Sequence, residues 1–221
     1  ACTSNMGHCL WVGIVDEDKA SSAAERLMSP DLFSGWVIRT LSSDMGAYNP
    51  VSYHNGSVWP HDTAIVATGL MRYGFVDEAM KIASGILDAA EHFDGRLPEL
   101  FCGFDRSEFH GPVPYPTACS PQAWAAAAPI QLARIMLRFD PDFTRNVVHL
   151  APILPEKIGD FKAANVLLGL RGGAVGPGGG GATQRRAGTC GGQGGCGGRR
   201  RWQRPCPANW PARRSTWRRR G

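Results

Sequence analysis

The 221-residue sequence lacks any apolar run that approaches the ~20 residues needed to cross a lipid bilayer. It also lacks a basic segment followed by an apolar stretch near its start, which is the pattern of a secretory signal. The cysteines of the first 170 residues have no paired spacing, so free thiols are expected at Cys2, Cys9, Cys102 and Cys119. These absences predict a cytoplasmic protein without membrane partners, and the missing initiator methionine predicts a fragment that starts inside a domain.

Residues 171–221 lack both lysine and acidic residues, although they contain twelve arginines. The formal net charge of +5 for the whole chain therefore hides a negative region, because residues 1–170 hold twelve basic and 19 acidic residues. The C-terminal segment is mostly Gly, Arg, Pro, Ala, Cys and Trp, and it can bury too little apolar surface to offset the entropy of ordering it. We predict a folded region over 1–170 and a disordered tail over 171–221, whose composition also matches GC-rich DNA translated out of frame.

Hydrophobic periodicity predicts helices in the region 1–170. One helix spans Asp16 to Leu27. A second begins with Asp62 as its N-cap and ends at Tyr73-Gly74, and a third spans Asp77 to Phe93. The second and third are close enough in sequence to form a helical hairpin.

A fourth helix is predicted with Ser120 as its cap and Pro121 in its first turn, and it continues to Phe139. Residues 4–8 are typical of the end of a preceding helix, and residues 146–155 are typical of an extended segment. Long loops over 29–61 and 94–119 alternate with the helices, and loops of this length are uncommon unless they are functional. The alternation predicts an all-α fold of the kind from which an (α/α) toroid is built, with the loops lining a pocket.

Three loop segments are rich in aromatic and hydrogen-bonding groups: 53–62 (YHNGSVWPHD), 96–103 (RLPELFCG) and 120–124 (SPQAW). With residues 5–8 and 33–41, they resemble the C-terminal part of bacterial amylo-α-1,6-glucosidases, which are glycoside hydrolases of the glycogen-debranching type. The resemblance covers roughly residues 1 to 170 and implies the last two or so hairpins of a six-hairpin toroid. The sequence departs from this family at Val37, where Gly is usual, and at Thr63, where Asn is common.

Glycoside hydrolysis usually needs two carboxyl groups, one as a proton donor and one ionised. Glu99 is the candidate for the ionised group, because Pro98 fixes the backbone before it, apolar residues flank it, and the resemblance implies a catalytic base in its Leu-Pro-Glu-Leu motif. The alternative is an ordinary surface glutamate. The resemblance implies that the acid is an Asp upstream of Ala1, so the fragment is expected to be inactive alone; the local alternatives are Asp62, Asp94, Asp105 and Glu108.

A second set of residues combines ring faces for stacking on sugars with donors and acceptors for hydroxyl groups. The alternatives are a packed aromatic loop for the histidines, a helix cap for Asp62 and a core position for Trp124. The histidines of the loop are seven residues apart and have no Cys or acidic pair at ligand spacing, so neither a metal nor a cofactor is expected. The predicted substrate-binding residues are Tyr53, His54, Asn55, Trp59, His61, Asp62, Gln122, Trp124 and Arg39.

Three functions are open on these grounds. The first is a fragment of an α-glucan-acting glycosidase that cleaves α-1,6-linked glucose at glycogen branch points, with Glu99 activating water. The second is a glucan-binding module without turnover. The third is a nucleic-acid-associated protein, because the arginine-rich tail could contact phosphates, although it lacks the Phe and Tyr residues that stack on bases and predicts no specific nucleic-acid partner.

Overall fold

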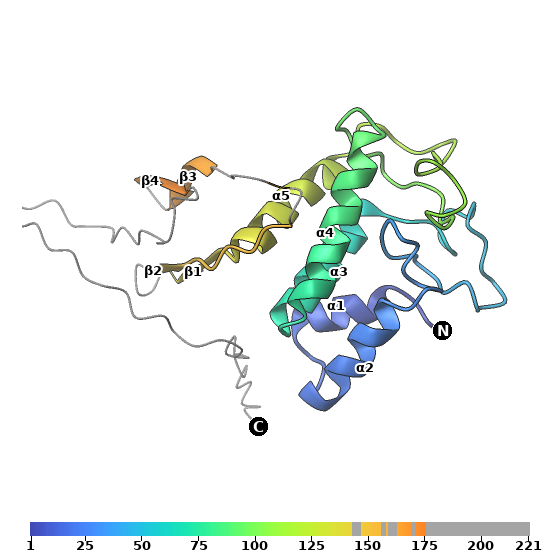
Figure 1. Cartoon of the computed structure of the whole chain (residues 1–221), viewed down its shortest axis with the longest axis horizontal. Helices are drawn as coiled ribbons and strands as arrows, with labels where there is room; N and C mark the ends of the chain where they lie inside the picture. Colours follow the sequence, from blue (N-terminus) through green and yellow to red (C-terminus); the bar gives the residue numbers. More distant parts are fainter. Residues whose placement is uncertain (143–146, 156–157, 159–162, 169–170, 176–221) are drawn as a thin grey trace, which may run out of the picture. The chain divides into compact units, whose positions relative to one another are not determined.

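The computed structural model describes residues 1–142, 147–155, 158, 163–168 and 171–175 (Figure 1). These residues belong to two compact units, one formed by Ala1–Ile135 and the other lying within Met136–Pro207. The described residues are mostly helical, and none of their helices is long and apolar enough to cross a membrane. Most of the predicted tail, residues 176–221, lies outside this description.

The first unit begins with α1 (Asn5–Val12) and α2 (Glu17–Leu27). The second of these confirms the helix predicted over Asp16 to Leu27. The prediction for residues 4–8 is wrong, because they begin a helix and do not end one. The helix ends instead at Gly13, which has a φ of 75° and donates its N–H to the carbonyls of Cys9 and Leu10.

The predicted hairpin is formed by α3 (Pro60–Arg72) and α4 (Val76–Glu91), which lie side by side (Figure 1). Asp62 is not the N-cap of α3, because Trp59 occupies that position and Pro60, whose φ suits a first helical turn, begins the helix. Asp62 lies in the first turn, and its Oδ1 is 2.5 Å from Nε2 of His8 in α1.

Glycines bring α1 and α3 close together. A Cβ atom on Gly69 of α3 would lie 2.6 Å from the carbonyl oxygen of Gly7, and one on Gly7 would lie 2.5 Å from a methyl carbon of Val66. Neither position has room for a larger side chain. The two helices therefore pack backbone against backbone, and this close packing places His8 beside Asp62.

Between the helices, extended segments meet in single antiparallel bridges that helical periodicity does not predict. Arg39 bridges to Val58, Val58 to Phe101, and Phe101 to Pro114. We call this row of four the loop ladder. The N–H of Val58 donates to the carbonyl of Phe101 at 2.9 Å, and the N–H of Phe101 donates back at 3.0 Å. The all-α prediction is thus right about the helices but omits this extended structure, and the partial toroid stays a prediction.

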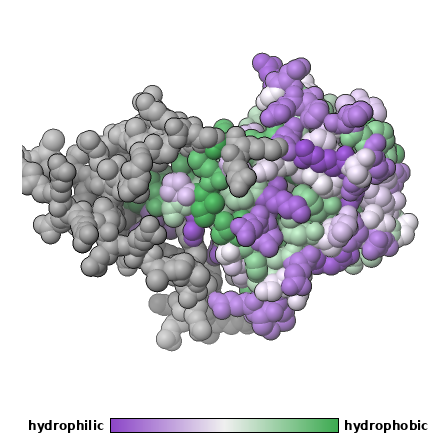
Figure 2. All heavy atoms as spheres, viewed as in Figure 1, coloured by the Kyte–Doolittle hydropathy of each residue, from purple (hydrophilic) through white to green (hydrophobic). Residues whose placement is uncertain are grey.

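The last helix, α5 (Ala123–Leu137), begins later than predicted. The carbonyl of Gln122 accepts the N–H of Ala126 at 2.9 Å, so Gln122 and not Ser120 occupies the cap position, and Pro121 lies outside the helix. Figure 2 shows hydrophilic and hydrophobic side chains mixed on the visible face of the described residues. Several large apolar side chains are exposed, among them Trp124 of α5 at 46%.

The second unit contains two antiparallel strand pairs. In the first pair, β1 (Asp140–Asp142) lies beside β2 (Val147–His149), where the sequence predicted an extended segment. In the second pair, β3 (Ala163–Leu168) lies beside β4 (Arg171–Val175). This pair crosses the predicted domain boundary at residue 170, because the hydrogen-bonded strands lie on both sides of it.

Candidate active site

Glu99 lies next to the loop ladder, two residues before Phe101. The residue is 6% exposed, and Leu97 and Leu100 on either side are buried. Its backbone N–H donates to the carbonyl of Cys119 at 2.9 Å. The backbone of Glu99 is therefore held on one side by the ladder and on the other by the segment that leads into α5.

The carboxylate of Glu99 accepts two hydrogen bonds. The Tyr53 hydroxyl donates to Oε1 at 2.8 Å, and the backbone N–H of Cys119 donates to Oε2 at 3.3 Å. The hydrogen bond from Tyr53 lowers the pKa of Glu99 most, burial opposes this effect, and the Cys119 N–H and the Gln122 side chain lower the pKa further. Glu99 is consequently ionised at neutral pH, the state in which a carboxylate can accept a proton from water.

The same hydrogen bond shifts the pKa of Tyr53 in the opposite direction. Its hydrogen bond to the Glu99 carboxylate is the main cause that raises the pKa of Tyr53, and burial adds to it. Tyr53 therefore stays protonated and acts as a donor to Glu99. This pairing joins two loops that are 46 residues apart in the sequence.

Aromatic rings gather beside this carboxylate and form what we call the aromatic cluster: Tyr53, His54, Trp59, His61, Tyr115 and Trp124. The Tyr53 and Trp59 ring centroids are 4.8 Å apart in an edge-to-face arrangement. The rings of His61 and Trp124 are stacked, with centroids 4.1 Å apart and an interplanar angle of 6°. The cluster thus draws its members from two long loops and from the starts of α3 and α5.

Two tryptophans of the aromatic cluster differ in exposure. Trp59 is 7% exposed, and its Nε1 donates to Ser57 Oγ at 3.0 Å and to the carbonyl of Tyr53 at 3.2 Å. Trp124 is 46% exposed. The geometry therefore gives Trp59 a supporting position within the cluster, whereas the ring of Trp124 is accessible to a ligand.

His8, His61 and Asp62 form a polar group next to the aromatic cluster. The hydrogen bond that His8 donates to Asp62 is the main cause that raises the pKa of His8, whereas burial is the main cause that lowers the pKa of His61. Both Asp62 and Glu99 act electrostatically on His61. Nδ1 of His61 and Oδ2 of Asp62 are buried without a hydrogen-bond partner, and such unpaired buried polar atoms are uncommon in proteins.

Residues 3–112 match the protein-family model described as the mannosylglycerate hydrolase MGH1-like glycoside hydrolase domain. Residues 3–112 are therefore similar to a glycoside hydrolase domain. The match includes Glu99 and its donor Tyr53, and it supports a glycoside hydrolase family without specifying amylo-α-1,6-glucosidases. No match to the chain is found among curated proteins.

Within the matched residues 3–112, Arg39 is the first member of the loop ladder and is 4% exposed. Its Nε donates to the carbonyl of Gly103 at 2.7 Å, its Nη1 donates to the carbonyl of Pro30 at 2.8 Å, and its Nη2 is 3.6 Å from Oδ2 of Asp105. The side chain joins the segment after Glu99 to an earlier loop. Its geometry is therefore that of a residue that positions this segment.

The remaining predicted residues of the domain differ in their contacts. His54 lies in the aromatic cluster, stacked parallel to Trp59 at 6.3 Å, while Asn55 is exposed in the same loop. Asp105 and Glu108 interact within their own loop, where the Asp105 N–H donates to Glu108 Oε1 at 2.9 Å. Asp94 is exposed beyond the end of α4. Among the residues that the structure describes, no group of three or more His, Cys, Asp and Glu is placed to hold a metal ion.

Sequence reasoning missed Tyr115 and Cys119. The ring of Tyr115 lies 5.7 Å from that of Tyr53, and Cys119 holds Glu99 through its backbone. The only local signal was the loop 94–119 itself, whose length suggested a function. The contact with Glu99 is made by a main-chain N–H, so the identity of the side chain at 119 could not reveal it.

Proposed function

We propose that Glu99 is the general base of a glycosidase that cleaves α-linked glucans. The observation that carries this proposal is the buried Glu99 carboxylate, which accepts hydrogen bonds from Tyr53 and Cys119, is ionised, and lies beside the aromatic cluster. In the proposed reaction, the oxygen of a water bonds to the anomeric carbon as the bond from that carbon to the leaving oxygen breaks. Glu99 takes the proton of the water, and a carboxylic acid protonates the leaving oxygen.

The aromatic cluster supplies the proposed sugar-binding surface. The ring of Trp124 offers a face for sugar C–H groups, and His61 supports it from behind at 4.1 Å. Trp59 holds Tyr53 in place through the bond from its Nε1 and so acts on the substrate indirectly.

We propose an α-1,6-linked glucose at a glucan branch point as the substrate, on the resemblance of the loop motifs. A second candidate is a mannoside whose leaving group is glycerate, since the family model that matches residues 3–112 carries the name of a mannosylglycerate hydrolase. The two candidates differ in the charge of the leaving group, because glycerate is an anion and a glucan is neutral.

The proposal is tested by the substitution Glu99→Gln in the natural full-length protein. The amide keeps the size of the side chain and an acceptor for Tyr53, but it has no charge with which to take a proton from water. We expect hydrolysis of a branched limit dextrin to fall at least ~10²–10⁴-fold while binding of a malto-oligosaccharide, followed by calorimetry, is retained.

Glu25→Gln is the matched control, since it makes the same change on an exposed residue of α2 in the same unit. Its turnover should equal that of the unmodified protein. Undiminished turnover in Glu99→Gln would reject Glu99 as the base. Oligosaccharide binding without hydrolysis in the unmodified protein would favour a glucan-binding module.

A further inference from the structure

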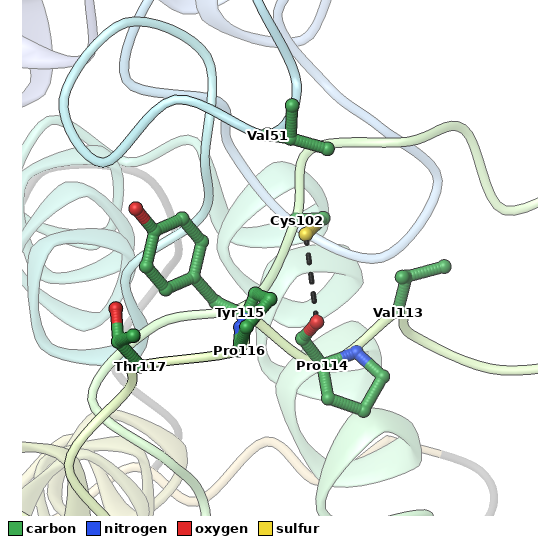
Figure 3. Close-up of a pocket in the computed structure, with 7 residues that line it drawn as sticks. All are labelled: Val51, Cys102, Val113, Pro114, Tyr115, Pro116 and Thr117. Carbon is green, nitrogen blue, oxygen red and sulfur yellow. Dashed lines mark hydrogen bonds between the residues drawn. The ribbon is translucent and has the colours of Figure 1, made fainter.

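A pocket with a volume of about 300 Å³ lies beside Tyr115 of the aromatic cluster (Figure 3). The segment 113–117 forms most of its wall, and Val51 and Cys102 complete it. Figure 3 shows the Tyr115 ring on one side of the pocket and Val113 on the other, with Cys102 and Pro114 between them. The loop ladder builds this wall, because the N–H of Cys102 donates to the carbonyl of Val113 at 2.9 Å.

The pocket neighbours the residues around Glu99 through Tyr115. One ring serves both places, since Tyr115 lines the pocket and its centroid is 5.7 Å from that of Tyr53, the donor to Glu99. Cys119, whose N–H donates to Glu99, follows Thr117 of the pocket wall by only two residues in the chain. Tyr115 and the segment that leads to Cys119 therefore place the pocket next to the residues that hold the Glu99 carboxylate.

The lining of the pocket carries no charged side chain. Its members are valines, prolines, a threonine, a tyrosine and a cysteine. Cys102 is 2% exposed, its Sγ donates to the carbonyl of Pro114 at 3.6 Å, and burial raises the pKa of its thiol, so it stays neutral. An anion placed here would lose hydration without gaining a cation, whereas an uncharged ring would exchange water for apolar contacts.

The buried cation Arg39 does not make the pocket more favourable for an anion. Arg39 approaches the neighbouring Gly103, but it donates to the Gly103 and Pro30 carbonyls and faces Asp105. It is also 4% exposed, so its charge is not presented to a ligand.

We propose that this pocket binds the leaving group of the glycoside and selects an uncharged ring over an anionic group. The inference rests on the proposed glycosidase function of Glu99. It specifies in addition that the leaving group of the substrate is uncharged. It favours a neutral glycan or aryl glycoside as substrate over a glycoside of glycerate.

The test uses the Glu99→Gln protein, in which ligands are not hydrolysed, and three probes: methyl, phenyl and 4-carboxyphenyl α-glycosides, each as the glucoside and the mannoside. Calorimetry should give phenyl glycosides about tenfold tighter binding than methyl glycosides, because the ring buries its apolar surface in the pocket. The 4-carboxyphenyl glycoside should lose most of this gain.

Val51→Lys in the same protein should weaken the preference for the uncharged ring, raising the affinity for the 4-carboxyphenyl glycoside relative to the phenyl glycoside about fivefold or more. Val51 is 50% exposed, so a lysine at this position does not disturb the packing of the core. Val12→Lys is the matched control, because Val12 is also 50% exposed and does not line the pocket, and it should leave the ratio unchanged.

The outcomes separate the two proposals. Equal affinities for methyl and phenyl glycosides, or a tighter 4-carboxyphenyl glycoside before Val51 is changed, overturn the assignment of the pocket alone. Failure of every glycoside to bind a protein that circular dichroism shows to be folded overturns the proposed sugar site and the pocket assignment with it.

Discussion

The α3–α4 hairpin and the loop ladder differ in what determines their structure. In the hairpin, buried residues recur with the helical period, and the turn at Tyr73–Phe75 is local. In the ladder, bridged positions are separated by 19 residues from Arg39 to Val58 and by 43 from Val58 to Phe101. The comparison shows that the candidate base lies on the region held by distant contacts, while the locally determined helices support it.

The largest expected effect is the loss of stability when Trp59, the buried tryptophan of the aromatic cluster, is replaced. Trp59→Ala removes a side chain that is 7% exposed and two hydrogen bonds from its Nε1. We expect the free energy of unfolding to fall by about 3–5 kcal/mol, measured by chemical denaturation. A loss below about 1 kcal/mol would show that the ladder does not depend on this ring.

A smaller loss of stability is expected where the backbone of Gly103 lies against that of Gly56. A Cβ atom on Gly103 would lie 1.7 Å from the carbonyl oxygen of Gly56, so Gly103→Ala must displace the backbone. The free energy of unfolding should fall by about 1–3 kcal/mol.

Gly46→Ala is the control for this change, since a Cβ there meets nothing within 4 Å. It should alter the free energy of unfolding by less than about 0.5 kcal/mol. Equal stability of the two variants would contradict the close packing of the loops.

The exposed tryptophan should affect binding and not stability. Trp124→Ala is expected to weaken malto-oligosaccharide binding by about 1–2 kcal/mol in calorimetry, because the ring supplies a stacking face. Its melting temperature should change little, as the side chain is exposed. Trp11→Ala, at a residue that is 43% exposed on α1 and outside the cluster, should leave the affinity unchanged.

The smallest expected effect is a shift in the pH dependence of hydrolysis. The base must be ionised, so activity falls as the pH drops through the pKa of Glu99. Tyr53 lowers that pKa and burial raises it, so Tyr53→Phe removes the main lowering influence and should raise it. The acidic limb of the pH–rate profile should therefore move to higher pH. An unmoved limb would mean that Tyr53 does not tune the base.

The sequence predicted Glu99 and most of the aromatic residues around it, although not how they are arranged. His61 and Trp124 are 63 residues apart, and nothing in their local sequences indicates that their rings stack. Asp62 was expected to cap a helix, yet it contacts His8 because glycines let α1 and α3 approach closely. Tyr115 and Cys119 were missed, since their roles depend on contacts across the loops.

The sequence by itself determined the helices, because their hydrophobic period and their end signals act within a few residues of each other. It also contains the residue types from which a glycosidase site was predicted, and that assignment stays a prediction. Only the tertiary structure decided that Tyr53 and the Cys119 backbone hold the Glu99 carboxylate, that Trp59 is buried while Trp124 is exposed, and that an uncharged pocket adjoins them. The physical reason is that hydrogen bonds, burial and ring stacking depend on distances in space, which the loop ladder sets by joining segments far apart in the chain.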